Sequence, residues 1–210
     1  MRLNERPFEN YSSAFLALLP SKIKVVVIGG GRAAYIKSRT FALKGCRVCV
    51  LSPEFIGEFD GIKDNIDMIK GKYQRKYIED AHIVVIATGD KKLNGVIGRH
   101  CSQLCKIYLD ASEPQRGNCI VPCQRNTENI SLGINTRNVG ISPITSVFIA
   151  EKAVGYLRNY DDFVKFTSKM RNSIENEDIR KKIMRFVCTE DFYFFYKEGK
   201  SSEIIKMFFG

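Results

Sequence analysis

Residues 25–34 read VVVIGGGRAA, and this stretch decides the fold of the chain. A run of β-branched residues that passes directly into glycines is typical of a central parallel strand, buried on both faces, that ends in a nucleotide-binding turn. The glycines fit the pattern GxGxxA: Gly29 allows the tight turn, Gly31 lets the backbone approach a pyrophosphate, and Ala34 keeps the next helix close to the sheet. That helix would point N–H groups and a positive dipole end at phosphates.

Strand and helix patterns alternate on both sides of this loop. Strands are expected at 23–28, 47–51, 66–69, 82–88 and 106–111, and helices at 32–44 and 91–105. This alternation predicts an α/β fold, a Rossmann-type doubly wound parallel sheet.

The pattern changes after residue 112. Residues 118–121 and 130–135 are expected to form a small antiparallel extension joined by the polar turn QRNTEN. Ser142 is expected to cap a helix that begins at Pro143, and a charged, aromatic tail is expected to be helical. The sequence therefore predicts three parts: a dinucleotide-binding domain over 1–112, the antiparallel region over 113–150, and a C-terminal helical subdomain over 151–210.

The charge of the chain suits an anionic partner, and the alternative is a solvated basic face with no function. The net charge is +10; residues 151–210 hold 12 basic and 10 acidic residues, so most of the excess lies in the first 150. A basic surface attracts anions, but no nucleic-acid motif accompanies it, so nucleic acid is not expected as a partner. No apolar run approaches the roughly 20 residues that span a bilayer. The short apolar patch FLALLP follows two glutamates, so we expect no signal peptide and a cytoplasmic location.

Cysteine and histidine do not form a metal-binding pattern in the sequence. The seven cysteines are an odd number, and the pairs that lie four apart do not form a repeated CxxC. His82 and His100 are far apart in the sequence. We expect buried, reduced thiols and no metal site.

The residue that would read a ribose departs from the usual pattern. An acidic residue is expected about 20 residues after the glycine loop, near Leu51 or Ser52, and neither is acidic. Glu54 comes slightly later, and no arginine follows immediately to hold a 2′-phosphate. This arrangement favours NAD over NADP.

Four blocks together resemble one family. The blocks are GGGRAAYIKSRTFALKGCRVCVLSPE, IVVIATGDKKLN, IYLDASEPQRGNCIVP and ISLGINTRNVGISPITSVFIAEKA, and they extend over about residues 11–157. They resemble the precorrin-2 dehydrogenase family, which includes the N-terminal module of siroheme synthase. The resemblance implies an enzyme that oxidises precorrin-2 to sirohydrochlorin with NAD, in siroheme or cobalamin (porphyrin-type tetrapyrrole) biosynthesis. It also implies a homodimer formed by the region after the nucleotide-binding domain.

The resemblance also implies which residues form the site. The family's NAD contacts correspond to the glycine loop, the loop after the second strand and the end of the fourth strand: Gly29, Gly31, Arg32, Ala33, Ser52, Pro53, Glu54, Thr88 and Gly89. Its functional aspartate corresponds to Asp110, where it could take a proton as hydride leaves the macrocycle. The alternative for Asp110 is a cap of the turn that closes the strand.

The expected substrate is a tetrapyrrole polycarboxylate, so arginines are candidate clamps for it. These are Arg116, Arg125 and Arg137, each of which is alternatively a solvated surface charge. Thr136 matches a serine of the family's SSGGTSP segment only loosely, because NTRNVGISP is two residues longer. ASEP is likewise one residue longer than the family's APE.

Two other functions stay open at this point. A chelatase that inserts iron or cobalt into sirohydrochlorin would use the same Asp110, alone or beside the dehydrogenase. A non-catalytic NAD-sensing module would explain the glycine loop, but neither the Asp110 block nor the SP-capped helix. NADH formation distinguishes the dehydrogenase from both.

Overall fold

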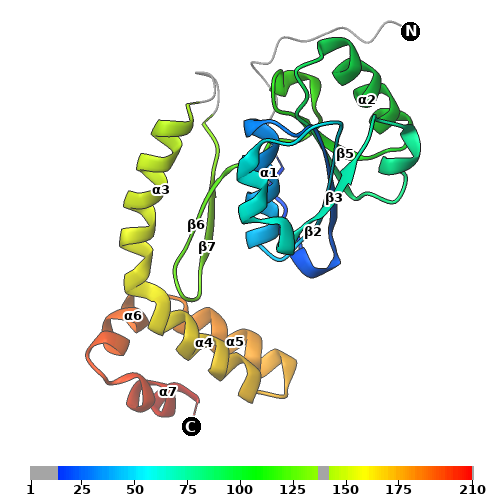
Figure 1. Cartoon of the computed structure of the whole chain (residues 1–210). Helices are drawn as coiled ribbons and strands as arrows, with labels where there is room; N and C mark the ends of the chain where they lie inside the picture. The colour runs from blue at the N-terminus through cyan, green and yellow to red at the C-terminus, as the bar shows by residue number, and fades with distance from the viewer. Residues whose placement is uncertain (1–13, 137–141, 210) are drawn as a thin grey trace, which may run out of the picture. The chain divides into compact units, whose positions relative to one another are not determined.

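The computed structural model describes residues 14–136 and 142–209 (Figure 1). These residues form two compact units: the first ends at Val121 and the second begins at Pro122. The division differs from the expected boundaries at 112 and 150, since residues 113–121 belong to the first unit and residues 122–209 form one unit. Across the part of the chain that is described, no helix is long and apolar enough to cross a membrane.

The first unit is built on a parallel sheet of five strands. The strands are β1 (Lys24–Ile28), β2 (Arg47–Ser52), β3 (Asp67–Lys70), β4 (Ile83–Ile86) and β5 (Ile107–Asp110). They lie in the order β3-β2-β1-β4-β5 and every neighbouring pair is parallel. The predicted doubly wound sheet is therefore confirmed. The strand order reverses between β1 and β4, and ligands of such sheets bind at the carboxyl ends of the strands beside that point.

Two helices cover the two faces of this sheet. They are α1 (Arg32–Leu43) and α2 (Lys91–Gln103). Successive side chains of a strand point to opposite faces, so Val27 lies in the buried cluster that holds Ala34 of α1, and Ile28 lies in the one that holds Ile97 of α2. This burial on both faces explains why β1 reads as an uninterrupted apolar run.

The segment after β2 is more ordered than the loop that the sequence suggests. It includes a 3₁₀ turn, Gly57–Gly61, in which Phe59 is almost fully buried. The Phe59 ring meets Tyr35 of α1 and Phe55 edge to face, with ring centroids 5.6 and 5.2 Å apart. These contacts hold the loop after β2 against the start of α1. Other 3₁₀ turns lie at Pro20–Lys22, Lys63–Asn65, Arg75–Ile78, Pro114–Arg116 and Arg158–Tyr160.

The second unit begins with a hairpin and a long helix. Strands β6 (Cys123–Asn126) and β7 (Ser131–Ile134) pair antiparallel, and α3 (Pro143–Leu157) packs against both. Ser142 caps α3, as expected. The expected strand at 118–121 is wrong: the N–H groups of Asn118 and Cys119 both donate to the carbonyl of Tyr108 in β5, so these residues border the parallel sheet instead.

The rest of the second unit is helical, as the sequence predicts. The helices are α4 (Asp161–Ser173), α5 (Glu177–Val187), α6 (Glu190–Lys197) and α7 (Ser201–Phe209). Their small core is centred on Ile183, Val187 and Phe192. The Asp161 carboxylate joins α4 to the hairpin, because it accepts hydrogen bonds from the Thr127 hydroxyl at 2.6 Å and the Asn129 N–H at 2.9 Å.

Candidate functional site

A cleft of about 680 Å³ lies at the carboxyl ends of β1, β2 and β4 in the first unit. Seven of the residues expected to contact a dinucleotide line it: Gly29, Gly31, Ser52, Pro53, Glu54, Thr88 and Gly89. The other two, Arg32 and Ala33, form the first turn of α1. The fold therefore gathers the three predicted segments at one place.

The three glycines of the loop differ in what a side chain at each position would meet. Gly29 has a φ of +132°, and a Cβ there would lie 2.3 Å from the carbonyl oxygen of Ala87. At Gly30 a Cβ would lie 1.9 Å from the carbonyl oxygen of Glu54, so this position also excludes a side chain. At Gly31 nothing lies within 4 Å of a Cβ, which leaves open space beside the backbone. Sequence reasoning missed Gly30, although the run of three glycines was a signal.

The N-terminus of α1 suits phosphate. Its N-cap residue is Gly31, which has no side chain to cap the helix, and the first main-chain bond within the helix is Tyr35 N–H to the carbonyl of Gly31. The N–H groups of the first turn are therefore left for a ligand. The N-terminus of α2 differs, because the Asp90 side chain accepts from the N–H groups of Lys92 and Leu93. The cleft thus fits a dinucleotide whose pyrophosphate lies at α1.

Beside Glu54, which the sequence assigned to the dinucleotide, the cleft contains one charge that the sequence did not assign, Lys72. Ser52 is buried, and Glu54 and Lys72 both line the cleft. The Arg32 guanidinium forms an ion pair with the Glu58 carboxylate at 3.1 Å. Lys72 was missed because it follows β3, the weakest strand in the sequence. Its neighbour Tyr73 also lines the cleft, and burial raises the pKa of the Tyr73 hydroxyl to about 12.

Asp110 is buried at the carboxyl end of β5, in register with Ile86 of β4. Its Oδ1 atom accepts three hydrogen bonds: from the Ser112 N–H at 2.9 Å, the Ser112 hydroxyl at 2.6 Å and the Glu113 N–H at 3.0 Å. Asp110 therefore does cap the turn after β5, as the alternative reading of the sequence had it. The same residue also lines a second cavity, so the two readings do not exclude each other.

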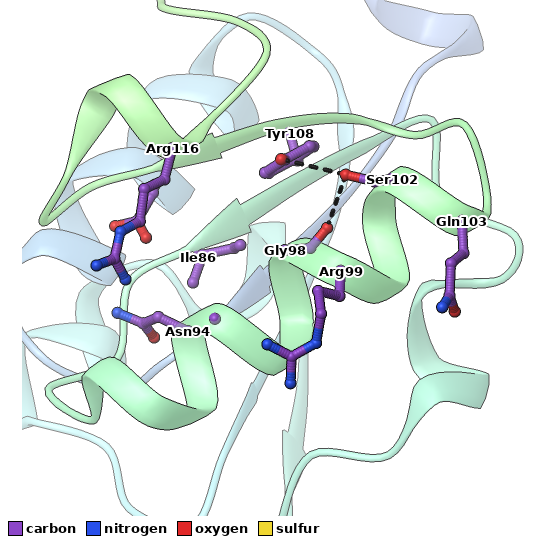
Figure 2. A pocket seen from close by; sticks show the side chains of 10 residues that line it. Ile86, Asn94, Gly98, Arg99, Ser102, Gln103, Tyr108 and Arg116 are labelled. Atoms are coloured by element: carbon purple, nitrogen blue, oxygen red, sulfur yellow. Dashed lines mark hydrogen bonds between the residues drawn. The ribbon is translucent and has the colours of Figure 1, made fainter. Parts of the chain in front are cut away.

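This second cavity, of about 390 Å³, lies between α2 and β5. Figure 2 shows Arg116 and Arg99 on its two sides, with Ile86 and Asn94 between them. Arg116, a predicted clamp, is held by an ion pair of its Nε atom with Glu113 at 2.7 Å. Arg99 was missed, since the sequence gives no sign that this face of α2 borders a cavity.

The remaining substrate candidates lie in the second unit or outside the described residues. Thr136 follows β7, and its hydroxyl accepts from the Ser142 N–H at 3.4 Å. Arg125 pairs with Glu151 at 3.2 Å and donates to the carbonyl of Gln124. Arg137 lies outside the described residues.

The seven cysteines are free, and they differ in exposure. Cys46, Cys49 and Cys101 are buried, and burial raises the pKa of each thiol, to about 12 for Cys101. Cys105 and Cys188 are exposed, so the expectation of buried thiols is wrong for these two. Within residues 14–136 and 142–209, no three His, Cys, Asp or Glu side chains gather as a metal site would need.

Comparison with known proteins agrees with this geometry. A family model described as "Putative NAD(P)-binding" matches residues 16–123, just over half of the chain. The chain belongs to this NAD(P)-binding family. The matched residues include the glycine loop, the loop after β2, the end of β4 and Asp110.

Individual relatives are consistent with the resemblance seen in the sequence. A precorrin-2 dehydrogenase of Priestia megaterium is 25% identical over 79% of this chain and 82% of its own length. A siroheme synthase of Psychrobacter sp. (strain PRwf-1) is 24% identical over 86% of this chain, which spans 36% of that longer protein. The solved structure of SirC, a precorrin-2 dehydrogenase, superposes with a TM-score of 0.64 at 20% identity, covering 93% of this chain and all of that one, and shows a shared fold.

Proposed function

We propose that this protein oxidises precorrin-2 to sirohydrochlorin with NAD, using Asp110 as the catalytic carboxylate. The observation that carries the proposal is the position of Asp110. It is a buried carboxylate at the end of β5, in register with the end of β4, and the residues that follow β4 line the dinucleotide cleft. The relatives named precorrin-2 dehydrogenase and siroheme synthase support the choice of substrate.

The reaction removes one hydride and one proton from the macrocycle. NAD, when bound, accepts the hydride. The proton goes to Asp110, and the hydrogen bonds of that residue decide which oxygen takes it. Because Oδ1 already accepts three hydrogen bonds, the proton is taken up by Oδ2. The turn that caps Asp110 thereby fixes the orientation of the carboxylate.

The cavity between α2 and β5 supplies positive charge beside this carboxylate. Arg99 and Arg116 line it together with Asp110. The substrate carries several carboxylates, and a guanidinium can bind a carboxylate with two parallel hydrogen bonds. We therefore assign the two arginines to substrate carboxylates. Arg116 keeps its orientation through Glu113, which also donates its N–H to Asp110.

We assign the cleft to NAD rather than NADP on the basis of Glu54. Glu54 lines the cleft directly after β2, where the adenosine ribose of a dinucleotide lies in this fold. A carboxylate there can accept from ribose hydroxyls and repels a 2′-phosphate. Lys72 acts in the opposite sense, so the preference for NAD depends on Glu54.

Free thiols at exposed Cys105 and Cys188 suit a reducing compartment, in agreement with a cytoplasmic location.

The protein forms a homodimer through the second unit. Three large apolar side chains of α3 are exposed: Ile144, Phe148 and Tyr156 are 84%, 61% and 62% exposed, and the Nζ atom of Lys152 lies over the Phe148 ring at 5.8 Å from its centroid. Residues spaced four apart share a helix face, and an apolar helix face of this kind is normally covered. A second copy of the same helix would cover it, in line with the dimer that the family resemblance implies.

Anaerobic incubation of the protein with precorrin-2 and NAD tests the function. We expect absorbance of NADH to rise together with the spectrum of sirohydrochlorin. If NAD binds and no NADH forms, the dehydrogenase proposal fails. Insertion of cobalt or iron into sirohydrochlorin would then identify a chelatase, and NAD binding with neither reaction would identify a sensing module.

A further inference from the structure

We propose that Asn94 is a positioning residue that ties the dinucleotide cleft to Asp110. The inference rests on the proposed function for its chemistry, but its geometry is independent of the substrate. Asn94 lies in α2 and is 2% exposed, although asparagine is usually a surface residue. It lines the cavity that contains Asp110, while its partner Thr88 lines the dinucleotide cleft.

A continuous chain of hydrogen bonds passes through Asn94. On one side its Oδ1 is bonded to the Thr88 hydroxyl, and its Nδ2 donates to the Thr88 carbonyl at 3.2 Å. On the other side Nδ2 donates to the Ser112 hydroxyl oxygen at 3.2 Å. The Ser112 hydroxyl in turn donates to Oδ1 of Asp110 at 2.6 Å. Four residues from three separate segments are therefore linked through a single buried amide.

The directions of the hydrogen bonds in this chain follow from the atoms that can only accept, and the Thr88 hydroxyl also lies 3.3 Å from a second acceptor, the Asp90 carbonyl. A carbonyl oxygen only accepts, so the NH₂ group of Asn94 must face Thr88 O, and the amide oxygen must accept from the Thr88 hydroxyl. The Ser112 oxygen accepts from Asn94, so its single proton goes to Asp110, which as a carboxylate only accepts. The Thr88 oxygen in turn accepts from the Asp90 N–H at 3.2 Å. Along the side chains the donors therefore point from the cleft toward Asp110, while one N–H of Asn94 donates back to the Thr88 carbonyl.

This arrangement makes the position of Asp110 depend on the loop after β4. A dinucleotide that orders Thr88 also fixes the Asn94 amide, and through Ser112 it fixes the turn whose N–H groups hold Oδ1 of Asp110. Hydrogen-bonded networks of this kind rigidify a site, and loss of one member leaves other groups without partners. The carboxylate is then held in place for the proton only when the cofactor side is ordered.

Asn94→Leu and Ser112→Ala test the proposal, with Asn118→Ala as the matched control. The side chain of Asn118 also bridges two main-chain groups near β5: it accepts a hydrogen bond from the Tyr108 N–H at 2.7 Å and donates one to the Lys106 carbonyl at 2.8 Å. Asn118 does not belong to the hydrogen-bond chain that ends at Asp110. We expect kcat of Asn94→Leu to fall about 10- to 100-fold, as for other residues that orient a catalytic group. KM for NAD should stay within about threefold, and Asn118→Ala should keep its kcat.

Amide hydrogen exchange gives a readout that needs no turnover. In the wild type, NAD should slow exchange at the N–H groups of Ser112 and Glu113, which hold Asp110. In Asn94→Leu and in Ser112→Ala, NAD should still bind but this slowing should be lost. If Asn94→Leu does not fold, Ser112→Ala decides, since Ser112 is an exposed residue.

The outcomes separate this inference from the proposed function. Slowing of exchange that persists in both variants, or kcat values equal to that of Asn118→Ala, would overturn the role of Asn94. A wild type that forms no NADH from precorrin-2 would overturn the proposed function. The exchange data would still show whether Asn94 couples the cleft to Asp110.

Discussion

Gly30 lies against the carbonyl oxygen of Glu54 so closely that an added Cβ would be 1.9 Å from it. The N–H of Ile56 also donates to the carbonyl of Gly30 at 3.0 Å, so the glycine loop and the loop after β2 are fastened together. The wall of the cleft near the ribose is thus built on the phosphate-binding loop. A change in the glycine loop should therefore alter the contacts of both the pyrophosphate and the adenosine ribose of a bound dinucleotide.

Gly30→Ala should lower the stability of the fold, whereas Gly31→Ala should weaken the binding of NAD. At position 30 the methyl group collides with main-chain atoms, so we expect a loss of about 1–3 kcal/mol in the free energy of unfolding. At position 31 nothing lies within 4 Å, so the fold should keep its stability while the methyl group obstructs the pyrophosphate. Thermal unfolding and NAD titration by calorimetry measure the two effects. Equal stability of both variants would contradict the geometry of the loop.

Glu54→Gln should narrow the preference for NAD over NADP. The glutamine keeps the size of the side chain and removes the charge that repels a 2′-phosphate, so the ratio of the two Kd values should shift by about tenfold toward NADP. Asp60→Asn is the control, because Asp60 is exposed and does not line the cleft. An unchanged ratio in Glu54→Gln would mean that Glu54 does not face the ribose.

Asp161 should make the stability of the second unit depend on pH. The hydrogen bond from the Thr127 hydroxyl is the main reason that the pKa of this carboxyl lies below its ordinary value of 3.8. A carboxyl with a lowered folded pKa stabilises the fold above its unfolded pKa, and the stabilisation is lost as the pH falls through the folded pKa. Asp161→Asn should therefore lower Tm near about pH 7, and the difference in Tm should disappear as the pH falls through the folded pKa of Asp161. The adjacent Asp162→Asn is the control, and a pH-independent difference in Tm would contradict this role.

Phe148→Glu should convert a dimer into a monomer. The substitution places a charge at the centre of the exposed apolar face of α3, where it would have to be buried in the interface. Light scattering after size-exclusion chromatography measures the mass. Ile36→Glu, on α1 and 50% exposed, is the control and should leave the mass unchanged. A wild type that is monomeric at micromolar concentration would contradict the proposed interface.

The sequence was sufficient to predict the parallel sheet and the place of the cleft. The apolar run of β1, the glycines after it and the alternation of elements are local signals, and each has a direct physical cause. The strand at 118–121 was wrong because Asn118 and Cys119 bond to Tyr108 in another strand, and the pattern of residues 118–121 alone does not report this contact. Phe59 shows the same limit, since only tertiary packing makes it a core residue.

The candidate site was predictable where function coincides with a motif. Asp110 was predicted from the block IYLDASEPQRGNCIVP, and Thr88 was predicted from its place at the end of β4. Asn94 and Arg99 come from one helix whose pattern of residues is ordinary, and their importance arises from what α2 faces. Ser112 likewise reads as a plain turn residue until its hydroxyl is seen to donate to Asp110.

The central claim is that Asp110 takes the proton when precorrin-2 is oxidised, and Asp110→Asn tests it most directly. Asparagine keeps the shape of the side chain and removes the carboxylate that receives the proton. Asp80→Asn is the control, since Asp80 pairs with Lys24 at the opposite end of β1 from the cleft. With NADH followed under anaerobic conditions, we expect Asp110→Asn to lose at least about 100-fold in kcat while it still binds NAD. Asp80→Asn should remain active, and an Asp110→Asn variant as active as Asp80→Asn would contradict the account.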